Sequence, residues 1–315
     1  MPIKHIKTMA ALSVVAVSAS VSATPLSDYN LILSDDFNVS GGSGHIEGKA
    51  FIGGNVVKGS VFAQHINKSS TENTVKVVGN FASNSAMHVE AGYVAYQGNF
   101  TGPTNICNGN SMGSSGCVKK ITDGSLTTEK AAILTELNSE ANYFKGLSAS
   151  IGTSIFGDSN NKTFKYSGAA TDLAVFTISA TDLANLNWNV DFGSAVNLLI
   201  NVTGNVFNAG NAHVNGFQNR ANNVLWNFSD ATNLNFGDSW YGSILALNAT
   251  INTNSNLNGA IAAKSYIGNG EIHDYHWNYT PPKPPKPPVK VPEPSTLLLS
   301  LLGLGLVLLR HTRRK

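Results

Sequence analysis

The feature that most constrains the fold is a Gly-Asn pair that recurs directly after short runs of alternating apolar residues. It appears at Gly54-Asn55, Gly79-Asn80, Gly98-Asn99 and Gly204-Asn205. Glycine and asparagine tolerate the positive φ angles of tight turns, so each pair predicts the end of a strand. The first three pairs lie 25 and 19 residues apart, a spacing typical of solenoid coils. Strands this short must stack on one another to bury their apolar face.

The chain after Thr163 repeats this pattern of short apolar runs bounded by Asn, Asp and Gly, as far as Gly268. Near the start of the body, Ile46, Ala50 and Ile52 are separated by even numbers of residues, as the buried positions of a half-buried strand are. We therefore predict a mainly β domain, an irregular right-handed β-helix or solenoid. The uneven period excludes a strict repeat array, and a β-sandwich with similar turns is the alternative.

One segment, Ser125 to Ala149, has helical periodicity instead. Its apolar stripe consists of Ile133, Leu134, Leu137, Ala141 and Phe144. We predict a single α-helix over about 126–149 that flanks the β body. Thr127 or Thr128 is the expected N-cap, and Gly146 lies near the expected end.

The N-terminus has the features of an export signal. Lys4 and Lys7 precede an apolar stretch from Met9 to Val21, and the small residues Ser22 and Ala23 follow. This order predicts a secretory signal peptide, residues 1–23, with cleavage after Ala23.

The C-terminus joins four different segments in order. Residues 280–290 are rich in proline and lysine, which predicts an extended polyproline II spacer. The motif Val291, Pro292, Glu293, Pro294, Ser295 follows, and then an apolar stretch, 296–309, predicted to be a helix. The basic tip consists of Arg310, Arg313, Arg314 and Lys315. An apolar helix with a basic end stops in a membrane, so 296–309 is predicted to contact the bacterial membrane at least transiently. Its 14 residues are short for a span of roughly 20.

The body between these ends is acidic. Residues 24–280 contain 12 Lys and Arg against 18 Asp and Glu, whereas the whole chain has a formal net charge of +2. An exported body with a charge of about −6 gives no electrostatic reason to expect nucleic-acid binding.

The two cysteines, Cys107 and Cys117, bracket a loop of Asn, Gly and Ser. In an oxidising compartment a local disulfide is the expected state. A cysteine metal site would need further ligands close by, and the neighbouring sequence offers none.

The densest polar cluster is the stretch 271–276. On a strand Glu271 and His273 would share one face, and His276 would point to the other. A metal site needs three converging ligands, so we predict no metal and no cofactor, with Glu271 and His273 as the only candidates. Asp35 and Asp36 fit an ordinary turn. Neither a P-loop, a Gly-x-Ser-x-Gly motif nor a dinucleotide fingerprint occurs, and no catalytic residue is predicted.

The C-terminal motif, apolar helix and arginine cluster resemble the PEP-CTERM sorting signal, 291–315. This resemblance implies processing by an exosortase, a membrane-embedded cysteine transpeptidase-like enzyme. The body, 24–279, resembles the choice-of-anchor A domain of bacterial surface proteins through several short motifs: Tyr29-Asn30-Leu31, Glu47-Gly48, Gly53-Gly54-Asn55, Trp226-Asn227-Phe228, Gly242–Ala246, Asn258–Ala262 and Asn269–His273. The blocks Gly242–Ala246 and Asn258–Ala262 are also distantly similar to ice-binding-like bacterial adhesins, which implies a β-helix with a flanking helix.

These features predict an exported structural or adhesive protein associated with exopolysaccharide. It would reside in the cell envelope, at the surface or in the extracellular (biofilm) matrix of a Gram-negative-type bacterium. The alternative is a carbohydrate-active enzyme, a β-helical polysaccharide lyase or hydrolase, delivered by the same tail. A lyase should show two carboxylates and a basic residue converging in a groove, and a structural protein flat polar faces. Ice binding would need a long Thr-x-Thr face, which Thr250 and Thr253 do not supply.

Overall fold

The structure is a computed structural model that describes residues 24–39, 44–59, 61–82, 87–103, 105–107, 110 and 116–282 of the 315-residue chain. The predicted signal peptide, most of the spacer, the sorting motif 291–295, the apolar helix 296–309 and the basic tip lie outside these residues. Among the described residues, no helix has the length and apolarity needed to cross a bilayer.

The body up to Thr280 is one compact unit. Its two buried hydrophobic clusters draw all their residues from the stretch between Leu26 and Trp277. The body therefore contains a complete core of its own, as a domain that folds independently does.

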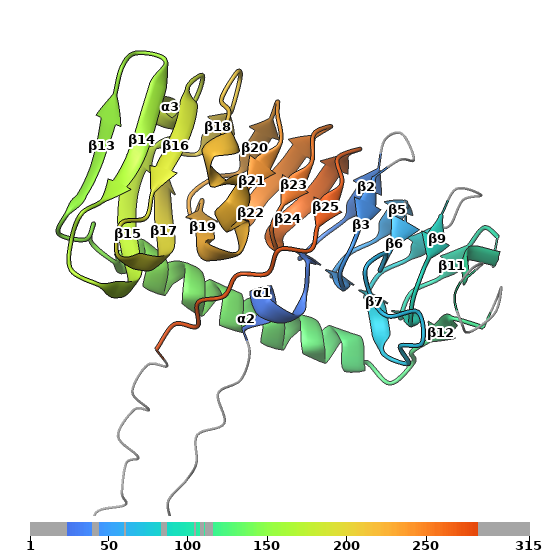
Figure 1. Cartoon of the computed structure of the whole chain (residues 1–315). Helices are drawn as coiled ribbons and strands as arrows, with labels where there is room; N and C mark the ends of the chain where they lie inside the picture. The colour runs from blue at the N-terminus through green and yellow to red at the C-terminus, as the bar shows by residue number, and fades with distance from the viewer. Residues whose placement is uncertain are drawn as a thin grey trace, which may run out of the picture. The chain divides into compact units, whose positions relative to one another are not determined.

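The described strands form three sheets (Figure 1). The largest has sixteen strands: β1 (Leu31–Leu33), β2 (Phe37–Val39), β4 (Ala50–Ile52), β5 (Val56–Lys58), β7 (Asn73–Val77), β8 (Phe81–Ala82), β10 (Tyr93–Tyr96), β11 (Phe100–Thr101), β12 (Val118–Lys120), β15 (Thr171–Ser179), β17 (Ala195–Thr203), β18 (Val206–Asn208), β19 (Val224–Asn227), β20 (Asn233–Phe236), β22 (Ser243–Thr253) and β24 (Ile261–Gly268). The six-stranded sheet contains β3 (His45–Ile46), β6 (Val61–Phe62), β9 (His88–Val89), β21 (Trp240–Tyr241), β23 (Leu257–Asn258) and β25 (Ile272–His273). The third consists of β13 (Thr153–Gly157), β14 (Asn161–Tyr166) and β16 (Asn187–Asp191).

The described helices are few. They are α1 (Pro25–Asp28), α2 (Ser125–Gly146), α3 (Ala180–Leu183) and the 3₁₀ helices η1 (Asn105–Cys107) and η2 (Asn215–Asn223). Every strand pair of the described chain is parallel except β13 with β14, so the predicted mainly β class is confirmed as a curled parallel sheet. This pairing excludes the β-sandwich alternative, which would be antiparallel.

The coils do not stack in the order of the sequence (Figure 1). β1 lies in the middle of the body, between β4 and β24. From β1 the chain coils outward through β4, β7 and β10 to β12. The helix α2 then runs back along the body, and the second half starts at the opposite end with β13. That half coils inward through β17, β19 and β22 until β24 pairs with β1.

The inner cluster of the core follows the predicted alternation. Ile46, Ala50, Ile52 and Val56 are at most 1% exposed and belong to one large cluster inside the coils. Phe51 points the opposite way and is nevertheless buried, in a second cluster outside the coils. A strand that is buried on both faces has a continuous apolar sequence instead of an alternating one. Burial of Phe51 in the outer cluster explains why β4 is apolar at every position.

The helix α2 supplies that second layer. Its Ile133, Leu137, Ala141 and Phe144 are buried against the outer faces of the central strands. Parallel strands need such a cover, because both of their faces carry apolar side chains. The predicted flanking helix is therefore confirmed.

The start of α2 differs from the prediction of a threonine cap. The N-cap residue is Gly124, with φ +76°, and Asp123 Oδ1 accepts a hydrogen bond from Ser125 N at 2.9 Å. The left-handed conformation at Gly124 turns the chain into the helix before the threonines are reached. The prediction of Thr127 or Thr128 as N-cap was therefore wrong, whereas Gly146 is indeed the last helical residue.

The first three Gly-Asn pairs stack in neighbouring coils. Asp36 Oδ1 accepts a hydrogen bond from Asn55 N at 2.6 Å, and Asn55 Oδ1 accepts one from Asn80 N at 2.9 Å. Asn80 Oδ1 in turn accepts one from Asn99 N at 2.9 Å. These bonds satisfy turn N–H groups that no strand partner reaches, so the repeat in the sequence is a side-chain ladder in the structure.

The glycines of these pairs are required by the close approach of successive turns. A Cβ atom on Gly79 would lie 2.5 Å from the carbonyl oxygen of Gly54, which no side chain can tolerate. The fourth pair belongs to the other half of the body and does not extend this ladder. There the Asn205 carbonyl accepts a hydrogen bond from Thr232 N at 2.8 Å.

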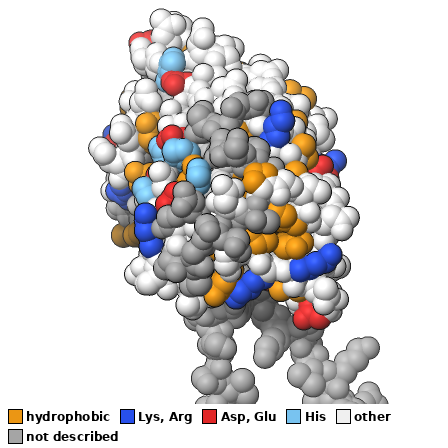
Figure 2. Space-filling view, turned by 90° about the vertical axis from the view of Figure 1, so that its right-hand side faces the viewer, with side chains coloured by type: hydrophobic (Ala, Val, Ile, Leu, Met, Phe, Trp, Pro, Cys, Tyr) orange, Lys and Arg blue, Asp and Glu red, His pale blue; other side chains and the backbone are white. Residues whose placement is uncertain are grey.

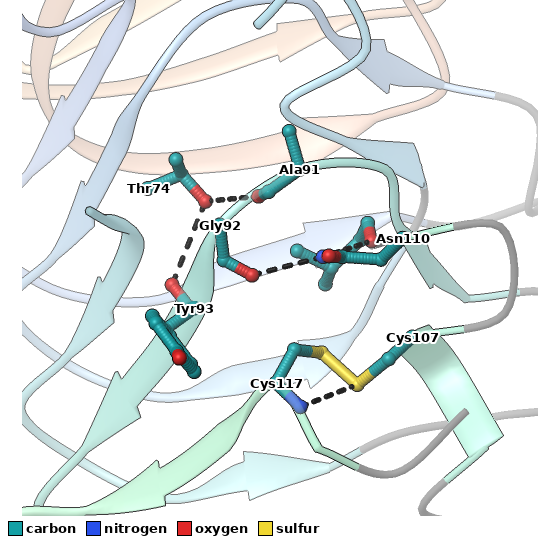
Figure 3. The surroundings of a disulfide bond; sticks show 8 residues. Thr74, Ala91, Gly92, Tyr93, Cys107, Asn110 and Cys117 are labelled. Atoms are coloured by element: carbon teal, nitrogen blue, oxygen red, sulfur yellow. Dashed lines mark hydrogen bonds between the residues drawn. A yellow bond between two sulfur atoms is a disulfide. The ribbon is translucent and has the colours of Figure 1, made fainter. Parts of the chain in front are cut away.

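At one end of the body β12 is the last strand of the large sheet, and the disulfide-bonded cysteines precede it. Cys107 and Cys117 form a disulfide with their Cα atoms 5.8 Å apart, and both side chains are fully buried (Figure 3). Cys117 N donates to Cys107 Sγ at 3.2 Å, and Val94 N donates to the Cys117 carbonyl at 2.7 Å. The bridge therefore fixes the segment that leads directly into β12.

Removing this bridge is expected to lower the free energy of unfolding by about 2–3 kcal/mol, because the loop it closes is short. The double variant Cys107→Ser with Cys117→Ser, compared with the wild-type body in urea, gives the value. Hydrogen exchange should accelerate in β10 and β12 and stay unchanged in β17. A reducing agent should have no effect on the variant, and equal stability of the two proteins would contradict the prediction.

Candidate functional site

Glu271 directly precedes β25 of the six-stranded sheet, and His273 lies on that strand. β25 pairs with β23 of the second half and with β3 of the first half. The two side chains share a face, as predicted for a strand, and His273 Nε2 lies 3.0 Å from Glu271 Oε2. The structure therefore places this pair at the seam where the two halves of the chain meet.

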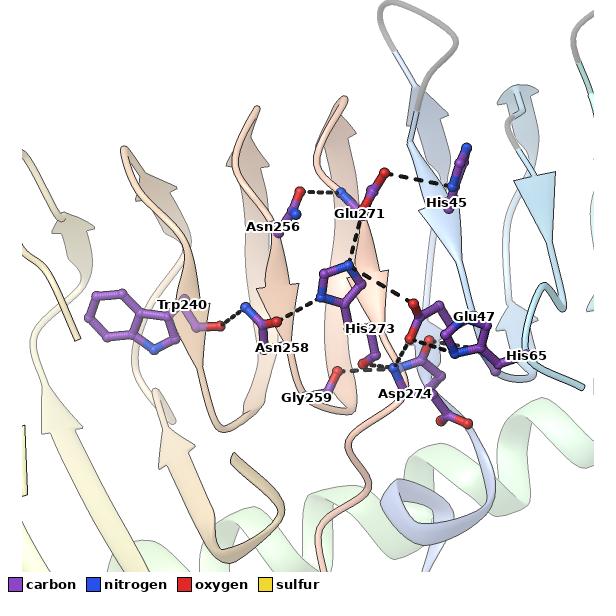
Figure 4. A network of polar contacts seen from close by, with 12 residues as sticks. His45, Glu47, His65, Trp240, Asn256, Asn258, Gly259, Glu271, His273 and Asp274 are labelled. Atoms are coloured by element: carbon purple, nitrogen blue, oxygen red, sulfur yellow. Dashed lines mark hydrogen bonds and ion pairs between the residues drawn. The ribbon is translucent and has the colours of Figure 1, made fainter. Parts of the chain in front are cut away.

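The ring of His273 is held from both sides (Figure 4). Its Nδ1 lies 2.7 Å from Asn258 Oδ1, and Asn258 Nδ2 donates to the Trp240 carbonyl at 3.2 Å. That second bond fixes the orientation of the amide, so an oxygen faces Nδ1. Glu47 Oε1 lies 4.0 Å from Nε2, beyond the nearer Glu271 carboxylate. Both ring nitrogens of His273 therefore face oxygen acceptors.

Glu47 joins this network from the first half of the chain. It is 13% exposed, and its Oε2 accepts a hydrogen bond from Asp274 N at 2.8 Å and lies 3.2 Å from His65 Nδ1. His45 Nδ1 lies 3.6 Å from Glu271 Oε1. Sequence reasoning missed Glu47, His45 and His65 as partners, because no local pattern connects them to β25.

His276 lies beyond β25 and forms a separate pair. Its Nε2 is 2.6 Å from Asp274 Oδ1, and its Nδ1 is 3.3 Å from the Leu26 carbonyl. The hydrogen bond that His276 Nε2 donates to the Asp274 carboxylate raises the pKa of His276 above its ordinary value. This pair ties the C-terminal segment of the body to α1.

The side chains at the seam form a series of histidine–carboxylate pairs, in which each polar group is already bonded to a neighbour. Within the described ranges, no group of three or more His, Cys, Asp or Glu side chains is arranged to hold a metal ion. The contacts of Glu47 and His273 reach across the junction of the two halves. The geometry assigns this network the role of holding the seam together.

A hollow of about 460 Å³ lies beside α3, near the end of the body that is opposite the disulfide. Its walls include Lys162 and one carboxylate, that of Asp182. Asp182 Oδ2 accepts a hydrogen bond from Ser179 Oγ at 2.6 Å, and Ser179 Oγ accepts one from Asp182 N at 3.0 Å. The carboxylate thus belongs to the cap of α3, and the described residues that line the hollow do not supply the carboxylate pair of a typical glycoside hydrolase.

The most regular surface feature is a polar face on the side of the coils formed by β18, β20, β22 and β24. Strand register aligns two outward rows across these strands. The first row is Val206, Asn233, Thr250 and Ser265, and the second is Asn208, Asn235, Asn252, Ile267 and, on β2, Asn38. We call these two rows the Asn face; its members are half-buried or exposed and uncharged.

Side-chain hydrogen bonds run along the Asn face. Asn235 Nδ2 donates to Asn208 Oδ1, and Asn252 Nδ2 donates to Asn233 Oδ1 at 3.4 Å. Successive strands in a sheet are about 4.8 Å apart, so the amides repeat at that spacing. The face is therefore a pre-ordered array of hydrogen-bonding groups without net charge.

Comparison with protein families identifies the body. Residues 22–274 match the family described as a putative ice-binding-like adhesive domain. The chain belongs to this family. The ice-binding-like adhesive body is followed by residues 290–315, which match the PEP-CTERM protein-sorting motif. The predicted sorting motif is thus confirmed, which indicates an exported, sorted surface protein and implies processing by an exosortase. The resemblance to a choice-of-anchor A domain stays a prediction.

Solved structures similar to this adhesive-family chain share little sequence with it. The ice-binding protein of the Antarctic ascomycete Antarctomyces psychrotrophicus is 14% identical, covering 81% of this chain and 97% of its own, with a TM-score of 0.29. A Shewanella frigidimarina ice-binding protein is 12% identical, covering 82% and 99%, with a TM-score of 0.32. A glycosylated ice-binding protein from an Arctic yeast is 12% identical, covering 85% and 99%, with a TM-score of 0.25. No curated protein sequence matches the chain.

Proposed function

We propose that this chain is a secreted adhesive or matrix protein whose Asn face binds extracellular polysaccharide. The observation that carries the proposal is the alignment of seven uncharged amide and hydroxyl side chains, together with Val206 and Ile267, in two rows across neighbouring strands. Sugar hydroxyl groups donate and accept hydrogen bonds, and a repeating polymer can meet a repeating array of amides at many points. Multiple weak contacts of this kind add up to useful adhesion.

The domain organisation belongs to the same proposal. Residues 1–23 direct export, 24–279 form the adhesive body, 280–290 act as a spacer, and 291–315 act as the sorting signal. The segment 296–309 contacts the membrane until an exosortase acts, with Arg310, Arg313, Arg314 and Lys315 on the cytoplasmic side. The coils of the body are right-handed, as connections between parallel strands almost always are.

The names of the similar solved structures describe proteins that bind ice. A regular threonine array is the surface we would expect for that ligand, and Thr250 is the only threonine in the two rows of the Asn face. Asparagine dominates instead, which favours a carbohydrate ligand. A measurement of thermal hysteresis with the same protein would separate the two ligands.

Replacing Asn235 and Asn252 together by alanine is expected to weaken polysaccharide binding by about tenfold or more, since two ordered amides are lost. The test is a binding screen of the body, residues 24–280, against bacterial exopolysaccharides. Asn138→Ala on α2 is the matched control, because Asn138 is exposed and far from the Asn face in the fold. Equal affinity of the double variant and the control would contradict the proposal.

The competing function is a polysaccharide lyase or hydrolase centred on Glu271 and His273. The observation that favours this enzymatic function is the position of His273 close to two carboxylates, those of Glu271 and Glu47. Incubation of the same polysaccharides with the body should release no new chain ends. Cleavage that disappears in Glu271→Gln or His273→Ala would replace the adhesive function with an enzymatic one.

A further inference from the structure

β13 is the outermost strand at the end of the body opposite the disulfide (Figure 1). It pairs with β14, and within the described part of the chain no other strand adds to its outer side. The neighbouring end strand β15 is covered at Val175, whose N–H donates to Ser150 Oγ at 3.0 Å and whose carbonyl accepts from Ser150 N at 2.9 Å. Among the described strands, this end therefore presents the edge of β13, which is outermost, and the part of the β15 edge that Ser150 does not contact.

The backbone of β13 offers hydrogen bonds in that outward direction. Ser167 N donates to the Gly152 carbonyl at 2.9 Å, so Gly152 and Ser167 are a hydrogen-bonded pair of the hairpin. Such pairs alternate along an antiparallel ladder, which assigns Ser154 and Phe156 to the bonds with β14. The N–H and C=O groups of Ile155, between them, point away from β14.

The side chains of this edge are uncharged, and two of them are large and apolar. The sequence of β13 is Thr-Ser-Ile-Phe-Gly, and Ile155 and Phe156 are 38% and 51% exposed. Ile151, just before the strand, is 97% exposed. Proteins usually protect free edges with lysine, proline or a bulge, and β13 has none of these.

The opposite end of the same body is protected. Its end strand β12 reads Val-Lys-Lys, with Lys119 and Lys120 exposed. Lys119 Nζ lies 3.0 Å from the centre of the Tyr93 ring. Figure 2 looks onto this end and shows lysine side chains around the exposed apolar atoms. The described end strands β12 and β13 thus differ, because β12 carries two exposed lysines and β13 carries no charge.

We propose that β13 is a self-association edge through which two copies of this chain pair end to end. The strands run antiparallel and are centred on Ile155, whose outward N–H and C=O groups bond to those of Ile155 in the second copy. Ser154 of each copy then faces Phe156 of the other. In a symmetric pair the same strand supplies both partners, so any charge on it would face an equal charge. β13 carries no charge and therefore does not repel a second copy.

The choice of a second copy follows from this symmetry and from the small size of the edge. A strand of five residues buries less than the roughly 1,200–2,000 Å² of a stable complex, so the dimer is weak and concentration-dependent. Its assembly closes at two copies, because the lysine-bearing β12 end cannot continue it. Dense display on a surface raises the local concentration that such a contact needs. The inference does not depend on the ligand of the Asn face.

The test is sedimentation equilibrium of the body, 24–280, and of the full chain up to high-micromolar concentration. The wild type is expected to dimerise. Two charged versions are then made: Ser154→Lys with Phe156→Lys, and Ser154→Glu with Phe156→Glu. Each alone should dimerise about tenfold or more weakly, because like charges face each other across the pair. Mixing the two should restore association as a heterodimer, because opposite charges then face each other.

Val57→Lys is the matched control, since Val57 is 45% exposed and lies on the side strand β5 rather than at an end. Circular dichroism melts verify that all variants stay folded. Recovery of pairing in the mixture also excludes misfolding as the cause of the loss. A wild type that stays monomeric, or charged versions that dimerise as the wild type does, would overturn the proposal.

Discussion

Asn30→Asp is expected to lower the free energy of unfolding of the body by about 3–5 kcal/mol. Asn30 is fully buried directly before β1, and both polar atoms of its side chain form hydrogen bonds. Its Oδ1 accepts from Gly48 N at 3.1 Å, and its Nδ2 donates to the carbonyls of His273 at 2.9 Å and Gly259 at 3.3 Å. One amide therefore links the first half of the chain to two segments of the second.

The aspartate is almost the same size, so the change isolates the hydrogen bonds. It turns two donated bonds into repulsion between a buried carboxylate and two carbonyl oxygens. Urea unfolding at neutral pH measures the cost, and acidification should recover part of it, because a protonated carboxyl group again donates one bond. Asn248→Asp is the matched control, since Asn248 is exposed and should change stability by only about 0.5 kcal/mol. Similar losses in both variants would disprove the seam role of Asn30.

Glu140 is expected to make the body less stable as the pH rises. Its side chain is 7% exposed on the inner side of α2, and neither carboxylate oxygen has a hydrogen-bond partner among the described residues. Burial, with a smaller contribution from the Glu136 charge, raises the pKa of Glu140 from 4.5 to about 7. Between these two pH values the folded protein keeps a proton that the unfolded chain has lost.

The sign follows directly from that difference in bound protons. The unfolding free energy falls as the pH rises from 4.5 to about 7, by about 3 kcal/mol in total, and is flat above. Glu140→Gln should remove this decrease and be more stable than the wild type by about 2–3 kcal/mol at pH values above 7. At a pH below 4.5 the two proteins should unfold at similar urea concentrations.

Glu136→Gln is the control for the Glu140 experiment. It removes an exposed carboxylate one helical turn away and should alter the pH profile only slightly. A stability difference between Glu140→Gln and wild type that is the same at low and high pH would contradict burial of the carboxyl group.

Local features of this fold were predictable from the sequence. The parity of Ile46, Ala50 and Ile52 identified inward-facing residues, because a strand alternates strictly between two faces. The Gly-Asn pairs marked turns, and the stripe on α2 marked a helix. Phe51 shows where this reasoning stopped, since an apolar residue of the wrong parity signals a second buried face.

The order of the coils was not predictable, because no local pattern states which strands are neighbours. β1 and β24 pair although they lie at opposite ends of the body sequence. The same holds for the seam network. Glu271 and His273 are two residues apart and were identified as a cluster, whereas Glu47 reaches them only through the tertiary fold. A side chain brought in over such a distance leaves no trace in spacing or periodicity.

The position of β1 in the middle of the body has a consequence for synthesis and export. The first half emerges with one edge of β1 and β2 unpaired, and its partner β24 is among the last strands to appear. Contacts between residues so far apart in sequence form slowly, and an open edge in the meantime invites pairing with other chains. Completion of the fold therefore waits for β24, so a product truncated before β24 lacks its closing strand. A natively folded body therefore indicates that translation has passed β24.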